Sequence, residues 1–373
     1  MLTSKEINRY ERHIQLPEIG IKGQEMIKNA SVLVIGAGGL GCPILQYLTA
    51  MGVGTIGIVD FDTISENNLQ RQVLYNTNEI GKYKVEVAVQ KLSRQNPNVK
   101  FITYCTQITN KNAIEIIKNY DIVVDGTDNF STRYLINDAC EIEKKPLVFG
   151  AIHRFEGQIT VFNYKKNNES VAINYRDLFP NPPSDTDAFN CSDIGVIGVL
   201  PGIIGTLQAT EVLKIITGVG NVLSGELLFL NALEMQFYTF QIFPDATRKN
   251  IGAEEYKSYD YGQFCTTSNQ EQINEINCDE LRNELLNNRK EIQLIDIRDN
   301  DELPRIKELE ELKIPLVDII ERVHELDPSK KIILICKSGI RSKIAIQMLH
   351  KKFGTKHLFS LKGGITEWGK KNQ

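Results

Sequence analysis

A glycine-rich turn between a buried strand and a helix constrains this chain most. The stretch VLVIGAGGLGCPI, residues 32–44, carries Gly36, Gly38 and Gly41 in the spacing G-x-G-x-x-G. Glycines let a phosphate approach the backbone, and the free N–H groups at the start of the next helix favour an anion. The turn therefore predicts an α/β fold with a phosphate-binding site where its first strand ends.

Apolar runs alternate with helical patterns through the first part of the chain. This alternation predicts a doubly wound, Rossmann-like sheet that is mostly parallel and has helices on both faces. GQITVFNY predicts a further strand, and GTLQATEVLKIITG predicts a helix that ends at Gly218. The earlier strands are ASVLVIG, IGIVDF, KFITYC, YDIVVDG and PLVFGA, with helices expected near 41–51, 83–95, 110–118 and 131–144.

The N-terminal stretch TSKEINRYERHIQL predicts a helix that begins with a capping box, because Thr3 is followed three residues later by Glu6. Ile7, Tyr10 and Ile14 would share one face of this helix, with Arg9 and Arg12 on the polar side.

Residues 246–276 are polar, charged and without apolar periodicity, so they predict a linker. Behind them a shorter alternating pattern returns: CDELRNELLNN and RSKIAIQMLHKKFG as helices, EIQLIDIRD and KKIILICKSG as strands. The expected organisation is a large α/β domain over 1–245, the linker, and a small α/β domain over 277–373.

Composition excludes several classes of protein. The formal charge is −4, so no basic excess indicates a nucleic-acid surface. No apolar stretch approaches the roughly 20 residues that cross a bilayer, and the first residues are not signal-like. Seven scattered cysteines without a CxxC pair argue against a disulfide scaffold. We expect a soluble, cytoplasmic protein that contacts neither nucleic acid nor membrane.

The ligand of the glycine turn is open between a dinucleotide and ATP on these features alone. Asp60, nineteen residues after Gly41, stands where a carboxylate receives ribose hydroxyls in dinucleotide-dependent oxidoreductases. Cations and further carboxylates follow, and they favour a triphosphate with Mg²⁺ because they can bind phosphate oxygens and the metal. These residues are Asp62, Asn68, Arg71, Lys84, Asp125 and Asp128.

Several ordered motifs carry a family resemblance. They are GAGGLGC, DFDTISENNLQRQ, GKYKVE, DGTDN, GAIHRFEGQITVF and GVLPGIIGTLQATEVLKIITG. Together they resemble the adenylyltransferases that activate ubiquitin-like sulfur carriers, of the MoeB and ThiF type, which are related to ubiquitin-activating enzymes. The resemblance covers residues 9–243.

The resemblance implies an ATP site, with Asp128 also positioning Mg²⁺. It implies a homodimer in which Arg12 reaches the phosphates of the neighbouring subunit. The implied reaction is attack of a carrier's C-terminal glycine carboxylate on the α-phosphate, which gives an acyl-adenylate and pyrophosphate. The residues that would bind or act on ATP are Gly36, Gly38, Gly39, Gly41, Asp60, Asp62, Asn68, Arg71, Lys84, Asp128 and Asn129.

Many relatives hold a structural zinc with two Cys-x-x-Cys pairs. Here the first place reads Asn174-Tyr175-Arg176-Asp177, and residues 245–249 at the second contain no cysteine. We therefore expect no zinc site.

Cys191, in the polar segment DAFNCSDIGVIG, matches the cysteine that relatives link to the carrier, although a buried packing role is an equal alternative.

The stretch ILICKSGIRS places Cys336 after a buried strand, in a six-residue loop closed by Arg341. Backbone N–H groups of such a turn form an anion cradle, and Lys337 adds positive charge. With LIDIRD upstream and SLKGGITEWGK downstream, the segment resembles a single-domain rhodanese. The resemblance implies that Cys336 carries sulfur from a donor as a persulfide. The usual Gly-His-Ile stretch after LIDIRD is replaced by LPRIKELEELKIPL, so donor docking is expected to differ.

Together these domains predict a bifunctional adenylyltransferase and sulfurtransferase that converts the Gly-Gly terminus of a ubiquitin-like sulfur carrier to a thiocarboxylate. The carrier could serve molybdopterin, thiamin thiazole or tRNA thiolation, and the motifs do not separate these pathways. Three alternatives rank lower: a thioester-forming activating enzyme, a carrier-binding module without catalysis, and an NAD-dependent oxidoreductase.

Overall fold

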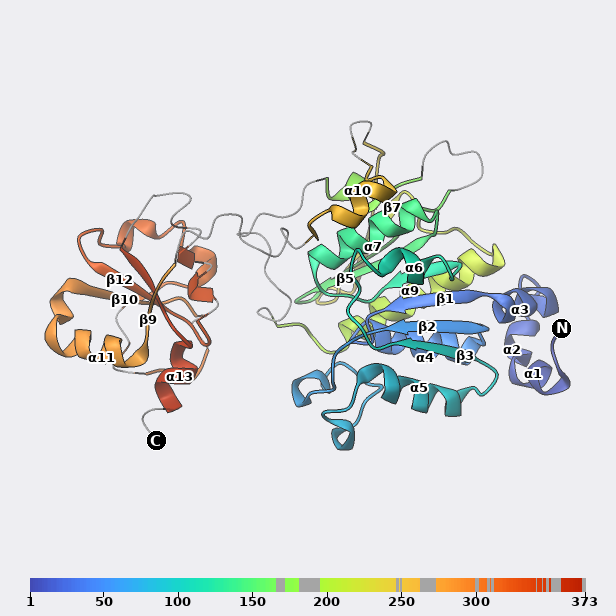
Figure 1. Cartoon of the computed structure of the whole chain (residues 1–373), viewed down its shortest axis with the longest axis horizontal. Coiled ribbons are helices and arrows are strands. Elements are labelled where there is room, and N and C mark those ends of the chain that lie inside the picture. The colour runs from blue at the N-terminus through green and yellow to red at the C-terminus, as the bar shows by residue number, and fades with distance from the viewer. Residues whose placement is uncertain are drawn as a thin grey trace. The chain divides into compact units, whose positions relative to one another are not determined.

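The computed structural model describes residues 1–165, 172–180, 195–245, 248, 250–261, 273–298, 302–306, 309, 312–339, 341–343, 345–346, 349 and 357–370. The chain forms two compact units (Figure 1). The first comprises Met1–Pro182 and Asn190–Cys265, and the second Pro183–Phe189 and Thr266–Gln373. Both have the predicted α/β architecture. The domain limits expected at residues 245 and 277 stay predictions.

The first unit is built on an eight-stranded sheet with the order β3-β2-β1-β4-β5-β6-β7-β8. The strands from β3 to β5 run parallel, and β6, β7 and β8 are antiparallel. The chain order reverses between β1 and β4, which opens a crevice at the carboxyl ends of these strands. The strands are β1 (Ser31–Ile35), β2 (Thr55–Val59), β3 (Lys100–Tyr104), β4 (Ile122–Asp125), β5 (Leu147–His153), β6 (Glu156–Phe162), β7 (Glu226–Asn231) and β8 (Gln236–Gln241).

Helices cover both faces of this sheet, because alternate residues of each buried strand point to opposite sides. Val32 and Val34 of β1 pack into one apolar core with α4, α5 and α9, whereas Leu33 and Ile35 pack into a second core with α6 and α7. The helices are α3 (Gly20–Asn29), α4 (Gly41–Met51), α5 (Lys84–Gln95), α6 (Ala113–Ile117), α7 (Phe130–Ile142), α8 (Tyr175–Leu178), α9 (Leu200–Thr217) and α10 (Ala253–Ser258).

The N-terminal helix differs from the prediction, because it is divided at Tyr10 into α1 (Ser4–Arg9) and α2 (Glu11–Ile14). The predicted capping box of Thr3 and Glu6 is present. The single apolar face is wrong, since Ile7 is 41% exposed whereas Tyr10 is buried and its hydroxyl accepts a hydrogen bond from Asn96.

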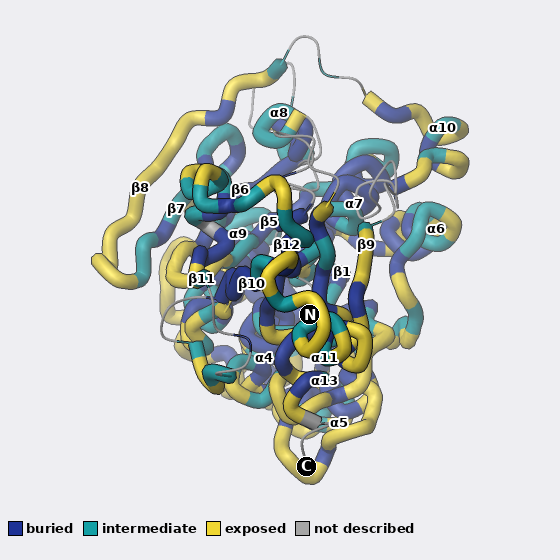
Figure 2. Tube along the Cα trace, turned by 90° about the vertical axis from the view of Figure 1, so that its left-hand side faces the viewer, coloured by how far each residue is buried: buried dark blue, intermediate teal, exposed yellow. Residues whose placement is uncertain are grey.

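At the far edge of the sheet, β8 is exposed along its whole length (Figure 2). It pairs with β7 through six registered residues. Its exposed side chains include Phe237, Tyr238 and Phe240.

The second unit contains a parallel five-stranded sheet with the order β11-β10-β12-β13-β9. The described residues 341–343, 345–346 and 349 are helical, in agreement with the helix predicted after the Cys336 loop. The other elements are β9 (Asn274–Ile276), α11 (Cys278–Asn287), β10 (Ile292–Asp296), β11 (Leu312–Lys313), β12 (Lys331–Ile335), β13 (Leu358–Leu361) and α13 (Gly364–Lys370).

Candidate active sites

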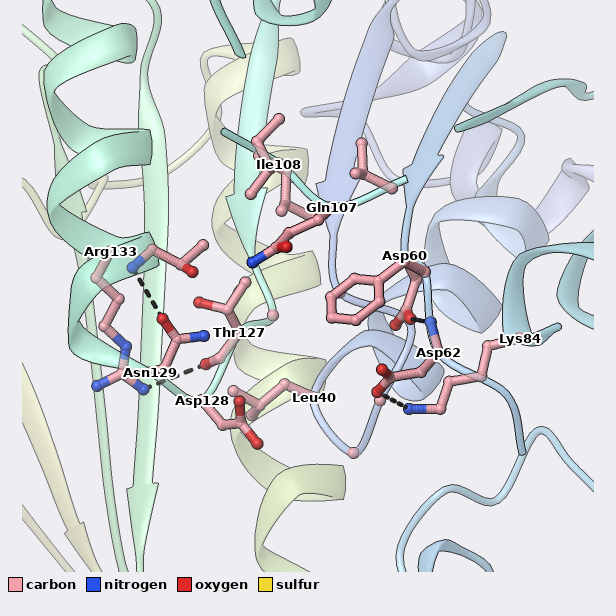
Figure 3. A pocket seen from close by; sticks show the side chains of 18 of the residues that line it. Leu40, Asp60, Asp62, Lys84, Gln107, Ile108, Thr127, Asp128, Asn129 and Arg133 are labelled. Atoms are coloured by element: carbon pink, nitrogen blue, oxygen red, sulfur yellow. Dashed lines mark hydrogen bonds and ion pairs between the residues drawn. The ribbon is translucent and has the colours of Figure 1, made fainter. Parts of the chain in front are cut away.

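A cavity of about 520 Å³ opens at the carboxyl ends of β1, β2 and β4. This volume is in the range of small-molecule and cofactor sites. Its two walls face one another across the glycine turn (Figure 3). Of the residues predicted from sequence, the lining includes Gly36, Gly38, Gly39, Asp60, Asp62, Arg71, Lys84, Asp128 and Asn129.

The glycine turn owes its shape to close backbone contacts. Gly36 has φ +96°, and a Cβ there would lie 2.6 Å from the carbonyl oxygen of Gly126. A Cβ on Gly41 would lie 2.0 Å from the carbonyl oxygen of Gly36. Gly41 begins α4 behind the turn, so it shapes the site while Gly38 and Gly39 face the cavity. These two contacts are the reason why only glycine fits both positions.

Asp60 at the end of β2 fastens the glycine turn. Its Oδ2 accepts a hydrogen bond from Ala37 N at 2.8 Å, and its Oδ1 accepts one from Asp62 N at 2.8 Å. Burial raises the pKa of this carboxyl, and the charge of Lys84 opposes that effect.

Lys84 supplies a buried cation on the same wall. Its ammonium is 2.8 Å from Asp62 Oδ2, and the Lys84 side chain is 5% exposed whereas that of Asp62 is 50% exposed. Figure 3 shows this pair beside Asp60. The burial of a fixed positive charge beside the glycine turn suits an anionic ligand.

Arg71 follows the short helical turn Glu66–Asn68, and it donates to the carbonyl of Asn67 at 3.0 Å. It also lines a second cavity of about 690 Å³, whose wall includes Pro43, Val199 and Leu207. Asn68 stands in that turn, and its amide donates to Asn67 Oδ1 rather than lining the first cavity.

The opposite wall holds two aspartates, Asp125 and Asp128, of which the resemblance assigned Mg²⁺ to Asp128. Asp125 is fully buried, and its Oδ1 accepts from the Thr127 N–H and hydroxyl at 2.8 and 2.7 Å. Burial raises the pKa of Asp125, with Arg133 and the Thr127 hydrogen bonds opposing. Asp128 is exposed and lines the cavity, whereas Asn129 caps α7 by accepting from Thr132 N. Asp125 therefore holds the turn, and Asp128 faces the ligand space.

Arg133 and Gln72 line the cavity and were missed in the sequence. Arg133 Nε lies 3.9 Å from Asp125 Oδ2, its Nη2 donates to the Thr127 carbonyl, and its guanidinium stacks on Phe149 at 5.4 Å. Its position four residues after the helix cap Asn129 was the available signal, because that spacing returns a side chain to the cap. Gln72, one residue after Arg71, had no comparable signal.

Arg12, which was also predicted as a site residue, does not line the cavity. Arg12 is exposed on α2, which packs on α3 just before β1 begins, so it lies at the amino end of the sheet, opposite the cavity (Figure 1). Cys191 lies outside the described residues. Cys42, in the helix after the glycine turn, is buried, and burial raises the pKa of its thiol to about 12.

In the second unit, Cys336 follows β12 and is fully buried. Its Sγ accepts a hydrogen bond from Gly339 N at 3.1 Å, which is one donor of the predicted anion cradle. Lys337 is exposed. Arg341 makes a bidentate ion pair with Glu302, with N–O distances of 2.8 and 2.7 Å, so the carboxylate of Glu302 neutralises part of the Arg341 charge.

The first turn of α13 fastens the Cys336 loop. Ile365 N donates to the Cys336 carbonyl at 3.0 Å, and Thr366 N and its hydroxyl donate to the Lys337 carbonyl at 3.1 and 2.8 Å. Gly364 has φ +57°, and a Cβ there would lie 2.3 Å from the Cys336 carbonyl oxygen. The glycine pair of SLKGGITEWGK thus lets the loop and the helix meet.

The LIDIRD motif forms a buried ion cluster at the end of β10. Asp296 accepts hydrogen bonds from Arg298 Nε and Nη2 at 2.9 and 2.7 Å and from Arg305 at 2.7 Å. Burial acts against its ionisation, but the hydrogen bonds from Arg298 outweigh burial and lower the pKa of Asp296.

No group of three or more His, Cys, Asp or Glu side chains in the described part of the chain could hold a metal ion. No helix among the described residues is long and apolar enough to cross a membrane.

Comparison with known proteins identifies relatives of both units. Residues 10–251 match the ThiF family, and residues 278–371 match the rhodanese-like domain. The probable adenylyltransferase/sulfurtransferase MoeZ of Mycobacterium tuberculosis is 40% identical over 100% of this chain and 95% of its own length. The sulfur carrier protein adenylyltransferase of Thermus thermophilus is 45% identical over 70% of this chain and 98% of its own.

Among solved structures, E. coli MccB with MccA-N7isoASN matches with a TM-score of 0.58 and 21% identity. The match covers 67% of this chain and 75% of that chain. At this identity the likeness shows the fold alone.

Proposed function

The chain belongs to the ThiF family, is an adenylyltransferase and sulfurtransferase, and ends in a rhodanese-like domain; from this premise we propose that it activates a ubiquitin-like sulfur carrier. ATP would adenylylate the C-terminal glycine of the carrier in the first unit. Sulfur from Cys336 would then replace the adenylate to give a thiocarboxylate.

The observation that carries this proposal is the buried ammonium of Lys84 beside the glycine turn, in a cavity with an exposed carboxylate on its opposite wall. Lys84 and Arg71 are suited to β- and γ-phosphates and to the charge that grows on a pyrophosphate leaving group. Asp60 would receive the ribose hydroxyls, because its lone pairs are not exhausted by its two backbone hydrogen bonds.

Asp128 is the residue we assign to Mg²⁺. Mg²⁺ is commonly held by one or two carboxylates together with substrate phosphates and water, so a single accessible carboxylate fits it. When bound, the metal would neutralise phosphate charge. The residues of the chain orient the reactants: a carrier carboxylate oxygen attacks the α-phosphorus, the bond to the β-phosphate oxygen breaks, and pyrophosphate leaves.

Arg12 enters this proposal through a second copy of the chain. Within one chain it stands at the amino end of the sheet, opposite the cavity. A homodimer would bring Arg12 of one protomer to the phosphates of its partner, and such shared sites need an isologous interface.

Sulfur transfer is assigned to Cys336. Its persulfide would attack the acyl carbon, AMP would leave, and an acyl disulfide would join the carrier to Cys336. We assign Cys191 to the next step: its thiolate attacks Cys336 Sγ, the thiocarboxylate leaves, and a Cys191–Cys336 disulfide remains for an external thiol to reduce. Cys336 must be reduced to accept sulfur, which supports a cytoplasmic setting. The carrier is the small subunit of molybdopterin synthase or the thiamin-thiazole carrier.

Two variants test the division of labour. Asp128→Ala should abolish carrier-dependent exchange of pyrophosphate into ATP, and Cys336→Ala should keep that exchange and lose thiocarboxylate formed from thiosulfate. Both are measured with each purified carrier and by mass spectrometry of its C-terminus. Full exchange by Asp128→Ala would contradict the adenylylation site, and unchanged thiocarboxylate from Cys336→Ala would contradict the sulfur route.

A further inference from the structure

Two buried hydroxyl groups lie behind the Cys336 thiol. Ser342 and Ser360 are both fully buried, and their Oγ atoms are 2.7 Å apart. Ser342 Oγ is 3.6 Å from Cys336 Sγ and 3.1 Å from the Gly339 carbonyl oxygen. Around them the core is apolar, with Leu334 and Leu358 among its members. Hydroxyls in such a place are retained only if they are hydrogen-bonded.

The Ser342 hydroxyl has one proton and three acceptors within its reach: the Gly339 carbonyl oxygen, Cys336 Sγ and Ser360 Oγ. The Gly339 carbonyl accepts it at 3.1 Å, and Cys336 Sγ is available at 3.6 Å, which is a sulfur hydrogen-bond distance. Ser360 Oγ is 2.7 Å from the Ser342 oxygen and 3.3 Å from the Gly339 carbonyl oxygen, so its proton can go to either, and the Ser342 oxygen is the nearer acceptor. If the two serine hydroxyls served only to hold the loop, they would need to bond the Gly339 carbonyl but would not need to contact Cys336 Sγ.

The two neighbouring cations, Arg341 and Lys337, do not take the place of such a neutral donor beside Cys336 Sγ. Arg341 is engaged by Glu302, and Lys337 is exposed. Among the described residues, the recorded hydrogen-bond partners of Cys336 Sγ are the Gly339 N–H and the Ser342 hydroxyl.

We propose that the Ser342 hydroxyl is a catalytic hydrogen-bond donor that follows the charge of Cys336, with Ser360 as its positioning residue. When Cys336 is a thiol, Ser342 donates to the Gly339 carbonyl. When Cys336 becomes a thiolate, the Ser342 O–H turns to Sγ. Ser360 donates to Ser342 throughout, and this polarises the hydroxyl and strengthens its bond to the anion. The inference rests on the proposed sulfur transfer through Cys336.

The hydroxyl acts at two points of sulfur transfer that can be followed with thiosulfate and cyanide. In loading, the Cys336 thiolate attacks the outer sulfur of thiosulfate, a new S–S bond forms, and the old S–S electron pair leaves with sulfite. In unloading, cyanide carbon attacks the terminal sulfur of the persulfide, thiocyanate forms, and Cys336 leaves as a thiolate. Charge on Sγ is greatest before the first step and after the second, where Ser342 stabilises it.

The test compares Ser342→Ala, Ser360→Ala and the double variant in the full chain. Losing a hydrogen bond to a charged group predicts about a tenfold lower kcat for Ser342→Ala with thiosulfate and cyanide. The KM for thiosulfate should not change, because Ser342 contacts Sγ and not the substrate. Ser360→Ala should lower kcat about threefold, and adding it to Ser342→Ala should change nothing further, because Ser360 acts through Ser342.

Ser342→Thr, which keeps the hydroxyl, should retain most of the activity. Fluorescence of the single tryptophan, Trp368, reports whether the second unit of each variant is folded, because the Trp368 side chain is buried in that unit. If Ser342→Ala does not fold, a wild-type kcat in Ser360→Ala overturns the inference, and a threefold loss at unchanged KM supports it. Additive losses, or a wild-type kcat in folded Ser342→Ala, overturn it while leaving Cys336 sulfur transfer intact. A wild-type chain inactive with thiosulfate would overturn both.

Discussion

The ammonium of Lys84 is buried, and among the described residues its one carboxylate partner is the half-exposed Asp62. This makes it the residue where phosphate binding can be tested most directly. Lys84→Met should lower pyrophosphate exchange by about a hundredfold or more, the loss seen when a preorganised donor to transition-state charge is removed. The measurement is the exchange rate at saturating ATP and carrier.

Lys82→Met is the matched control, since Lys82 is exposed, lies two residues away and does not line the cavity. It should exchange pyrophosphate at the wild-type rate. Equal losses in the two variants would mean that total charge in this segment, and not the placed ammonium of Lys84, supports the reaction.

Asp296 makes the stability of the second unit depend on pH. Its pKa is lowered below the ordinary value of 3.8, because hydrogen bonds from Arg298 outweigh the effect of burial. Its contribution is therefore complete above pH 3.8 and is lost as the pH falls through the lowered value. Asp296→Asn should lower the free energy of unfolding by about 3 kcal/mol at pH 7, because Arg298 and Arg305 lose their carboxylate. In this variant the free energy of unfolding should also fall less steeply than in the wild type as the pH is lowered.

Urea unfolding followed by Trp368 fluorescence between pH 7 and acid measures this effect. Glu321→Gln, at an exposed carboxylate of the same unit, should keep wild-type stability at pH 7. If the free energy of unfolding falls as steeply at acid pH in Asp296→Asn as in the wild type, Asp296 is not the cause of that fall.

At the residue scale, the strand-end pattern alone placed charges near the cavity without ranking them, and only the resemblance assigned Mg²⁺ to Asp128. DGTDN presents Asp125 and Asp128 as similar strand-end carboxylates, and only the folded chain buries one and exposes the other. The reason is geometric: Asp125 is the last residue of β4, while Asp128 lies beyond a turn that Thr127 closes. Arg133 escaped notice because its role depends on that same turn.

At the scale of elements, an ion pair joins the two segments that the resemblance marked as the places of zinc-binding Cys-x-x-Cys pairs. Arg248 Nη1 pairs with Asp177 Oδ2, and Asp177 Oδ1 accepts from Asp245 N at 2.9 Å. Asp177 is the third residue of α8, and its side chain is fully buried. The segment after β8 is thereby fixed to α8 by charge and hydrogen bonding.

Arg248→Met should therefore lower the free energy of unfolding of the first unit by about 3 kcal/mol, the typical loss when one partner of a buried pair is removed. Calorimetry measures the shift, and Lys111→Met at an exposed position is the control. A chelator should leave the wild-type unfolding temperature unchanged. One tightly bound zinc per chain in metal analysis would contradict this account.

Elements themselves were largely predictable, but their contacts were not. Apolar runs predicted β1 to β6, β10 and β12, because buried strands read as continuous apolar stretches. The strands β7, β8, β11 and β13 were not predicted, and β9 lies in the segment expected as a linker. The burial of Tyr10, the residue at which the first helix divides, was unpredictable, since its hydroxyl is bonded by Asn96, 86 residues away in sequence. The hydrogen bonds between α13 and the Cys336 loop were equally unpredictable. They require Gly364 at its position, because a Cβ there would collide with the Cys336 carbonyl oxygen.

At the scale of the whole molecule, the proposed homodimer with Arg12 acting across the interface predicts complementation between two inactive variants. Arg12→Ala and Asp128→Ala should each lose pyrophosphate exchange. In a mixed dimer, the cavity of the Arg12→Ala chain keeps Asp128 and receives Arg12 from its partner. An equal, fully exchanged mixture should recover roughly a quarter of wild-type activity, because half of the dimers are mixed and each has one intact site.

Sedimentation of the wild-type chain and subunit exchange with differently tagged copies provide the control. Mixing Asp128→Ala with Lys84→Met should recover nothing, because both changes fall in the same cavity. Recovery in that second mixture, or none in the first despite exchange, would contradict a shared site.

Arg71 belongs to the walls of two cavities, the one at the glycine turn and the second one of about 690 Å³. Such a shared side chain makes the two spaces thermodynamically linked. Any occupant of the second cavity that alters the position of the Arg71 guanidinium changes nucleotide affinity by some factor, and the nucleotide must change the affinity of that occupant by the same factor. The order in which ligands arrive would then alter the path taken but not the total binding free energy.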